Sequence, residues 1–271
     1  MSHELKNPAR RPRVALALSG GAARGAAHVG VLKVLLANNI PIDCVAGTSA
    51  GALVGAAFAA GLSIDELEKF ALTMRWRDFG RVTLSRLGVQ SNARMEEYVR
   101  AQFPITRIEA LRIPYAAVAT DLDTGGEVVL KDEGDLAFAI RASCAVPGWY
   151  VPVVDERGRQ LVDGGLVSLV PVAAARSFGA DIVIAVDVNH EGATFLGASR
   201  TAFGVILQSM VHAQRSACAH QVRQADVAIL PRVGHIRWDE MRRGAELIAA
   251  GEAAALEVLP QIERLLATHA V

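Results

Sequence analysis

The chain has 271 residues, of which 52% are hydrophobic and 21% are charged, which is enough for a large core in one or two domains; we favour one. Lys and Arg together number 28, as do Asp and Glu, so no overall charge attracts nucleic acid, and attraction to anionic lipid would need a local patch. Three widely spaced cysteines lie among apolar residues without metal-ligand spacing. They predict buried thiols in a reducing, cytoplasmic compartment. We expect neither a metal nor a cofactor.

Two apolar stretches resemble export or membrane signals. Val14 to Leu18 follows basic residues, as in a signal peptide, but Ser19-Gly20-Gly21 and Arg24 interrupt the run. Residues 44–62 carry no charge, yet their glycines make a poor membrane span, and a turn followed by a core helix explains them better. We therefore expect a flexible lead over residues 1–12 and a single domain over residues 13–271.

Strand-like apolar runs alternate with helical patterns along the chain. The predicted strands are Val14 to Leu18, Ile42 to Ala46, Ile113 to Ala119, Glu127 to Leu130, Asp181 to Val188 and Val227 to Leu230. The predicted helices are Ala26 to Asn38, Ala52 to Ala60, Asp65 to Met74, Pro171 to Phe178, Thr201 to Arg223 and Arg243 to Ala267. This alternation predicts an α/β fold in which helices cover both faces of a mostly parallel sheet and ligands bind at the carboxyl ends of its strands. Turn residues between Ala119 and Glu127 predict one hairpin, so the sheet is expected to be mixed.

A glycine-rich loop, Ser19-Gly20-Gly21-Ala22-Ala23-Arg24-Gly25, follows the first predicted strand. Its backbone N–H groups suit an anion, and three kinds of site use such groups. A dinucleotide fingerprint needs glycine where Ala22 stands, and a phosphate loop needs lysine and a hydroxyl residue after Gly25. The third use, an oxyanion hole, needs only aligned donors near a nucleophile.

The sequence Gly47-Thr48-Ser49-Ala50-Gly51 joins a predicted strand to a predicted helix. This pattern is typical of a nucleophile elbow, in which small neighbours allow a sharp turn that exposes the central serine. The N-terminus of the following helix would favour negative charge that develops near Ser49. A small-residue turn without chemistry is the alternative interpretation.

Residues 75–100 form a basic segment that also carries aromatic and leucine side chains. Its charged residues are Arg75, Arg77, Arg81, Arg86, Arg94 and Arg100 against Asp78, Glu96 and Glu97. Beside an apolar pocket, such a segment would suit an anionic lipid surface, which predicts a peripheral membrane contact. An ordinary solvated helix pair and a dimer contact are the alternatives.

A serine nucleophile needs a base, and the sequence offers two kinds. Asp163-Gly164-Gly165 follows the short apolar run Gln160-Leu161-Val162, which would place the carboxylate at a strand end. An ordinary aspartate has a pKa near ~3.9 and is a weak base at neutral pH, although exclusion of water would make it stronger. Asp-Gly sequences also simply shape turns. The second possibility is a triad of Ser49, Asp163 and either His190 or His235.

Three motifs in this order resemble the patatin-like phospholipase family: Gly20 to Gly25, Gly47 to Gly51, and Asp163 to Gly165. Ile140 to Gly148 is similar to that family's Ala-Ser-x-Ala-x-Pro segment, and Asp181 to Asp187 is similar to the strand that follows it. The resemblance therefore spans residues 13 to 190. It implies a compact three-layer α/β/α fold and a catalytic dyad without histidine. In that dyad Ser49 is the nucleophile and Asp163 is the base.

The resemblance also implies that backbone N–H groups of Gly20, Gly21 and Ala22 hold the oxyanion. The implied reaction is hydrolysis of phospholipid or other fatty-acyl esters through an acyl-enzyme. Ala22 departs from the family's third glycine, so a positive φ there would be strained. Trp149-Tyr150 also departs from the family pattern, which changes the expected pocket shape. We expect Arg24 either to position a substrate phosphate or to pair with a carboxylate at the loop.

The sequence therefore predicts a lipid acyl hydrolase with a Ser49–Asp163 dyad. One alternative is a Ser-His-Asp esterase that acts on soluble esters, and another is a regulatory or scaffolding protein with a vestigial pocket. The helices at Thr201 to Arg223 and Arg243 to Ala267 either pack on the core or form a homo-oligomer interface.

Overall fold

The computed structural model describes residues 11–192 and 201–269, so all but two residues of the predicted lead lie outside the described part. The centre of the molecule is an eight-stranded sheet in the order β11-β10-β1-β2-β5-β9-β8, with β6 also paired to β5; β3, β4 and β7 form a small second sheet. The strands are β1 (Val14–Leu18), β2 (Cys44–Thr48), β3 (Arg81–Val82), β4 (Gly88–Ser91), β5 (Tyr115–Asp121), β6 (Glu127–Lys131), β7 (Gly148–Tyr150), β8 (Val153–Val154), β9 (Gln160–Asp163), β10 (Ile182–Val186) and β11 (Val227–Ile229).

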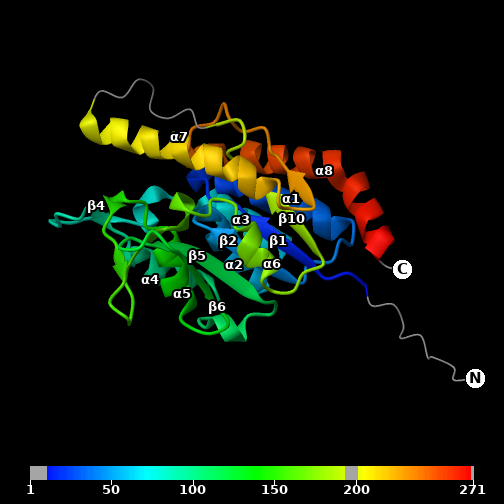
Figure 1. The fold of residues 1–271 in the computed structure, drawn as a ribbon, viewed down its shortest axis with the longest axis horizontal. Coiled ribbons are helices and arrows are strands. Elements are labelled where there is room, and N and C mark those ends of the chain that lie inside the picture. Colours follow the sequence, from blue (N-terminus) through cyan, green and yellow to red (C-terminus); the bar gives the residue numbers. More distant parts are fainter. Residues whose placement is uncertain (1–10, 193–200, 270–271) are drawn as a thin grey trace, which may run out of the picture.

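Helices flank the large sheet (Figure 1). Over the described ranges the α-helices are α1 (Ala27–Ala37), α2 (Ala50–Ala59), α3 (Ile64–Thr73), α4 (Ala93–Gln102), α5 (Leu136–Ser143), α6 (Val172–Arg176), α7 (Ala202–Val222) and α8 (Gly244–His269). Short 3₁₀ turns are η1 (Ala22–Ala26), η2 (Trp76–Asp78), η3 (Ile108–Ala110), η4 (Gly164–Leu166) and η5 (Met241–Arg243).

Strand β1 explains why helices cover both faces of the sheet. Its valine and leucines, Val14, Leu16 and Leu18, pack in one core cluster with residues of α1, α2, α3 and α8. Ala15 and Ala17 point to the other face, where they pack with residues of α6 and α7. Because side chains alternate along a strand, one apolar run supplies both layers of core. The predicted three-layer α/β/α architecture is confirmed.

The sheet is mixed, as predicted. β11, β10, β1, β2 and β5 run parallel, whereas β6 and β9 pair antiparallel with β5. The β5–β6 pair is the predicted hairpin. Since β1 and β2 are neighbours in a parallel sheet, their carboxyl ends lie at the same edge, which brings the glycine-rich loop next to the Gly47–Gly51 turn.

Every predicted strand and helix has a counterpart, with ends shifted by a few residues. The elements that the sequence pattern did not indicate are mainly α4, α5 and the small sheet of β3, β4 and β7. In α4 only Met95 and Val99 are buried, so its apolar periodicity is weak. β3 is a two-residue exposed strand, which gives no pattern at all.

The long C-terminal helix α8 packs on the core. It crosses α1 where Gly30 meets the carbonyl of Ile248 and Gly251 meets the carbonyl of Ala27, and a Cβ at either glycine would overlap that carbonyl. The close approach of the two helices therefore depends on these glycines. Within the described ranges, no helix is both long and apolar enough to span a bilayer.

Candidate active site

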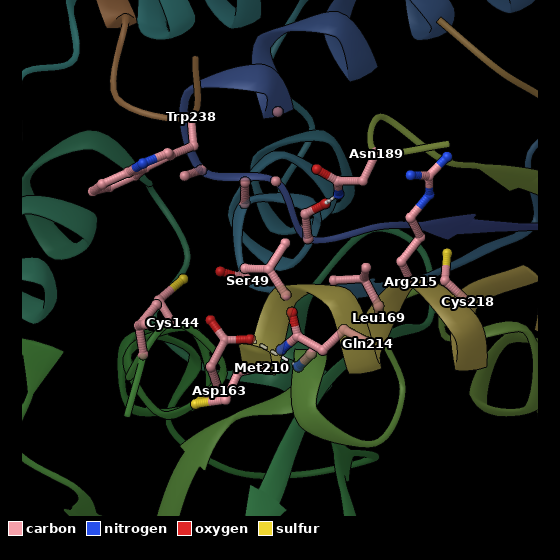
Figure 2. Close-up of a pocket in the computed structure, with 18 of the residues that line it drawn as sticks. Ser49, Cys144, Asp163, Leu169, Asn189, Met210, Gln214, Arg215, Cys218 and Trp238 are labelled. Carbon is pink, nitrogen blue, oxygen red and sulfur yellow. Dashed lines mark hydrogen bonds between the residues drawn. The ribbon is translucent and has the colours of Figure 1, made fainter. Parts of the chain in front are cut away.

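A cavity of about 770 Å³ opens at the carboxyl ends of β1 and β2. The loop after β1 and the turn after β2 line it from the sheet, and α7 lines it from the other side (Figure 2). Most of the lining is apolar, including Leu53, Trp76, Phe79, Trp149, Leu169, Leu207, Met210 and Val211. A cavity of this size and character suits a long apolar ligand.

Ser49 lies on the predicted sharp turn between β2 and α2. Its φ of 52° and ψ of −119° put it in a region that non-glycine residues rarely occupy. The turn forces close backbone contacts, since a Cβ on Gly47 would overlap the Gly51 carbonyl and a Cβ on Gly51 would overlap the Leu18 carbonyl. The two glycines of the G-x-S-x-G pattern therefore permit the conformation that exposes Ser49 to the cavity.

Ser143, at the end of α5, holds this turn in place. Its buried hydroxyl donates to the Val118 carbonyl at 2.5 Å and accepts the Ser49 N–H at 2.9 Å. One side chain thus links α5, β5 and Ser49. Because the Ser49 N–H is already bonded, it is not available to an oxyanion. Ser143 belongs to the Ile140–Gly148 segment that resembles the family pattern, but no local spacing in the sequence indicates this role.

Asp163 lies at the end of β9, next to Ser49 in Figure 2. Its carboxylate accepts the Gly165 N–H at 2.8 Å, and its main-chain N–H donates to the Ala145 carbonyl. Burial raises the pKa of Asp163 to about 6, although hydrogen bonds from Gly165 and the Ser49 hydroxyl favour the ionised form. Exclusion of water thus makes this carboxylate a stronger base than an ordinary aspartate.

The glycine-rich loop presents two N–H groups that the rest of the described chain leaves unbonded. The Gly20 N–H is not among them, because it donates to the Leu169 carbonyl at 3.0 Å. The N–H groups of Gly21 and Ala22 have no partner in the described residues. Ala22 has a φ of 50°, so the strain that sequence analysis expected at this departure from glycine is present.

The buried side chain of Arg24 anchors the glycine-rich loop. Its guanidinium is fully buried and donates to three main-chain carbonyls, those of Ile236, Gly192 and Gly234, at 2.7, 2.9 and 3.3 Å. Burial lowers its pKa, and Glu191 partly opposes this effect through space. These contacts differ from the expected ones, since Arg24 bonds carbonyls instead of a carboxylate and is too buried to touch a substrate phosphate.

Asn189 supports the same loop and was not singled out from the sequence. Its side chain donates to the Gly20 carbonyl at 2.6 Å (Figure 2), and its main-chain N–H donates to Asp187 at 2.8 Å. Asp187 also accepts the thiol of Cys218 on α7 at 3.2 Å. This chain of contacts connects the end of β10 to both the loop and α7. No sequence motif marks it, because its members are far apart along the chain.

The two candidate histidines are held by other groups. His235 is exposed and its ring nitrogen lies 2.9 Å from Glu246. His190 lines the cavity, and its ring nitrogen lies 3.4 Å from the Asp187 carbonyl. Asp163 bonds neither histidine. Over the described ranges, no group of three or more His, Cys, Asp or Glu side chains could hold a metal ion.

A family model for patatin-like phospholipases matches residues 16–176, a range that contains the loop, Ser49 and Asp163. The chain belongs to the patatin-like phospholipase family. The match ends before α7 and α8 begin. The helices that line the cavity opposite Ser49 and pack on α1 therefore lie outside the part of the chain that identifies the family.

Relatives in this family extend from bacteria to mammals. The chain is 42% identical over 181 residues to an uncharacterized NTE family protein of Mycobacterium tuberculosis, covering 66% of this chain and 49% of the relative. It is 35% identical over 190 residues to human patatin-like phospholipase domain-containing protein 6, covering 68% of this chain and 14% of the relative. The chain thus spans half or less of the length of these proteins.

A solved structure of the same fold is VipD from Legionella pneumophila. It superposes with a TM-score of 0.55 at 13% sequence identity, covering 93% of this chain and 67% of VipD. The superposition extends over nearly the whole chain, so it includes regions outside the family match. At this level of identity the likeness concerns the fold alone.

Proposed function

We propose that this chain is a serine hydrolase that cleaves fatty-acyl esters of lipids with a Ser49–Asp163 dyad. The observation that carries the proposal is a serine on a strained turn beside a buried carboxylate of raised pKa, at the wall of a large apolar cavity. Membership of the patatin-like phospholipase family supports a lipid ester as the substrate. An acyl chain in the cavity would bring its ester carbonyl to Ser49.

In the proposed reaction the Asp163 carboxylate takes the hydroxyl proton as Ser49 Oγ attacks the ester carbonyl. The N–H groups of Gly21 and Ala22 would stabilise the oxyanion of the tetrahedral intermediate. Asp163 then gives its proton to the departing alcohol, which leaves an acyl-enzyme at Ser49. A water molecule, deprotonated by Asp163, attacks this ester and releases the fatty acid.

The location of the enzyme follows from the same proposal. Among the described cysteines all three are buried free thiols, which supports a reducing, cytoplasmic compartment. A lipid substrate would bring the enzyme to the inner face of a membrane, and we propose that residues 75–100 make this peripheral contact. A homo-oligomer through the C-terminal helices remains a prediction from the sequence.

A fluorophosphonate probe tests the nucleophile. We expect the probe to modify Ser49, as mapped by mass spectrometry of the digested protein, and to leave Ser49→Ala unlabelled. Asp163→Asn should label far more slowly, because its amide cannot accept the proton. Ser216→Ala, which removes an exposed serine of α7 outside the cavity, is the matched control and should label normally. Labelling of another serine would contradict the proposal.

His190 is the basis of a second candidate mechanism, because it lines the cavity. If a Ser-His-Asp triad operated, His190→Ala would abolish hydrolysis of a soluble ester such as p-nitrophenyl butyrate. The dyad predicts that His190→Ala retains most of the activity, while Asp163→Asn loses it. Measuring both variants with one ester separates the two mechanisms.

A further inference from the structure

The hairpin of β3 and β4 presents large apolar side chains to solvent. Leu84 at its tip is 104% exposed, and Val82, Leu87 and Val89 are 74%, 59% and 48% exposed. A cluster of large exposed apolar side chains indicates a surface that binds another molecule or a membrane. The small sheet of β3, β4 and β7 leaves these side chains exposed.

The positive charge around the same hairpin indicates that its binding partner is negatively charged. Residues 79–95 include three arginines and no acidic residue. Arg94 donates to the carbonyl of Arg77, whereas the guanidinium groups of Arg81 and Arg86 have no hydrogen-bond or ion-pair partner among the described residues. By contrast, Arg100 in the following helix pairs with Asp135 at 2.8 Å. Two unpaired guanidinium groups beside exposed leucines favour a surface that is both apolar and anionic.

The hairpin is continuous with the wall of the cavity. Trp76 and Phe79, just before β3, line the cavity. β4 pairs with β7, whose Trp149 and Tyr150 also line it. A partner seated on the hairpin would therefore lie next to the space that leads to Ser49.

The N-terminal part of α7 adds a second apolar area at the same opening. Gly204 and Leu207 line the cavity, whereas Val205 and Ile206 are 52% and 59% exposed. In Figure 1 this end of α7 and strand β4 lie at the same end of the molecule, opposite the C-terminal end of α8. Two segments that are more than a hundred residues apart thus carry exposed apolar side chains close in the chain to residues that line the cavity.

We propose that these two segments form one docking surface for an anionic lipid bilayer. The docking surface comprises Arg81, Val82, Leu84, Arg86, Leu87 and Val89 of the hairpin, and Val205 and Ile206 of α7. The apolar side chains enter the boundary between headgroups and acyl chains, while the arginine stems let their guanidinium groups reach lipid phosphates. This inference rests on the proposed lipid hydrolysis, because the bilayer would deliver its substrate at the cavity opening.

A second copy of the chain fits this surface less well than a bilayer does. A symmetric dimer through the hairpin would bring Arg81 and Arg86 of one copy near those of the other. Residues 79–95 supply no acidic side chain to offset that repulsion. Headgroup phosphates of a bilayer would satisfy the same arginines.

Vesicle sedimentation with the Ser49→Ala protein tests the docking surface without hydrolysis. We expect binding to vesicles of equal parts phosphatidylcholine and phosphatidylglycerol, weak binding to phosphatidylcholine alone, and weaker binding as NaCl is added. Arg81→Gln with Arg86→Gln should lower binding to the anionic vesicles roughly 30-fold, at ~1 kcal/mol per arginine and tenfold per ~1.4 kcal/mol. Leu84→Ser with Leu87→Ser should lower vesicle binding by roughly 100-fold. Val205→Ser with Ile206→Ser should also lower vesicle binding.

Leu256→Ser with Arg264→Gln is the matched control, because it removes an exposed leucine and an exposed arginine from α8, whose C-terminal end lies opposite strand β4 in Figure 1. It should bind as the parent does, and melting temperatures should establish that every variant is folded. Equal binding by the hairpin variants, or equal binding to both kinds of vesicle, would overturn the proposal. So would a dimer in sedimentation velocity that Leu84→Ser with Leu87→Ser dissociates. If the protein binds as expected but wild type cleaves no ester, the docking surface stands and the proposed function fails.

Discussion

The turn around Ser49 lines the cavity, and the hairpin of β3 and β4 adjoins residues of its wall, but side chains are enclosed at the turn and exposed at the hairpin. At the turn, the strained backbone, the Ser143 hydroxyl and the Asp163 carboxylate are enclosed by neighbours that fix each group in one place. At the hairpin, leucines and arginines extend into solvent without partners in the described residues. A reacting group needs fixed geometry, whereas a group that meets a fluid surface needs exposure. Substitutions at the two regions should therefore affect different measurements.

Asp163→Asn should have the largest effect, and it should lower activity while raising folding stability. Loss of the general base should lower kcat by about 10³–10⁴-fold. Stability at pH 7 should rise by about 1–3 kcal/mol, because folding of the natural chain buries an ionised carboxylate whose pKa is raised to about 6. Soluble-ester kinetics and urea unfolding measure the two quantities. A variant that is both inactive and less stable would contradict this account of Asp163.

In the natural chain, activity and folding stability should depend on pH in opposite directions. Only ionised Asp163 can accept a proton, so activity should fall about tenfold per pH unit below its pKa of about 6. Stability should change the other way, because a carboxyl whose folded pKa is raised contributes stability below pH 4 that is lost as pH rises towards 6. Kinetics and chemical unfolding between pH 4 and pH 8 would measure both profiles. A rate that rises on acidification would be inconsistent with Asp163 as the base.

Ser143→Ala tests whether the buried hydroxyl positions the nucleophile. The Ser49 N–H and the Val118 carbonyl would both lose their partner, which should cost about 1–3 kcal/mol of stability. We expect kcat for a soluble ester to fall about 10- to 100-fold with little change in KM, because the turn would shift without altering the cavity wall. Ser143→Thr keeps the hydroxyl and should recover part of the rate. A purely structural role would lower stability and leave kcat unchanged.

Ala22→Gly should relieve strain in the loop. Alanine at a φ of 50° costs about 1–2 kcal/mol relative to a right-handed conformation, while the greater freedom of glycine in the unfolded chain offsets about half of this. The net gain in stability should be under about 1 kcal/mol, with activity retained because the residue 22 N–H is kept. Urea unfolding of the two proteins would measure it, and a marked loss of stability would show that the methyl group of Ala22 has a packing role.

Leu84→Ser should have the smallest effect on the isolated protein. An exposed side chain without neighbours contributes within about 0.5 kcal/mol to folding, so the melting temperature should stay close to that of the natural chain. Leu16→Ser, in the core of β1, is the contrasting variant and should fail to fold or melt far lower. A large destabilisation by Leu84→Ser would mean that the hairpin tip is packed and cannot insert into a bilayer.

Local sequence patterns predicted much of this fold. Long apolar runs and helical periodicity located β1, β2, β5 and the major helices, because these segments are buried on one or both faces. The patterns failed for α4, which buries only two side chains, and for β3, which has two residues. Elements that bury few side chains show little periodicity in the sequence. Helix α5 was not predicted either, although six of its eight residues are buried, because so short a helix spans only about two turns.

The candidate site divides in the same way. Ser49, Asp163 and the loop could be identified because their backbone geometry demands glycine at nearby positions, which is visible locally. Asn189 and the partners of Arg24 could not, since their contacts join segments about 170 to 210 residues apart. For Gly20 the sequence could not reveal that its N–H donates to Leu169. Long-range hydrogen bonds form only in the completed fold, so they produce no characteristic residue spacing in the sequence.

The residues that hold the glycine-rich loop in place are synthesised long after the loop itself. The Ala23 N–H donates to the Trp238 carbonyl, and Arg24 donates to the carbonyls of Ile236 and Gly234. A ribosome translates Ser49 and Asp163 before it reaches those acceptors. A growing chain that already contains Ser49 and Asp163 therefore still lacks the acceptors that hold the glycine-rich loop, so we expect this part of the candidate site to reach its final geometry only after residues 234–238 have folded against it.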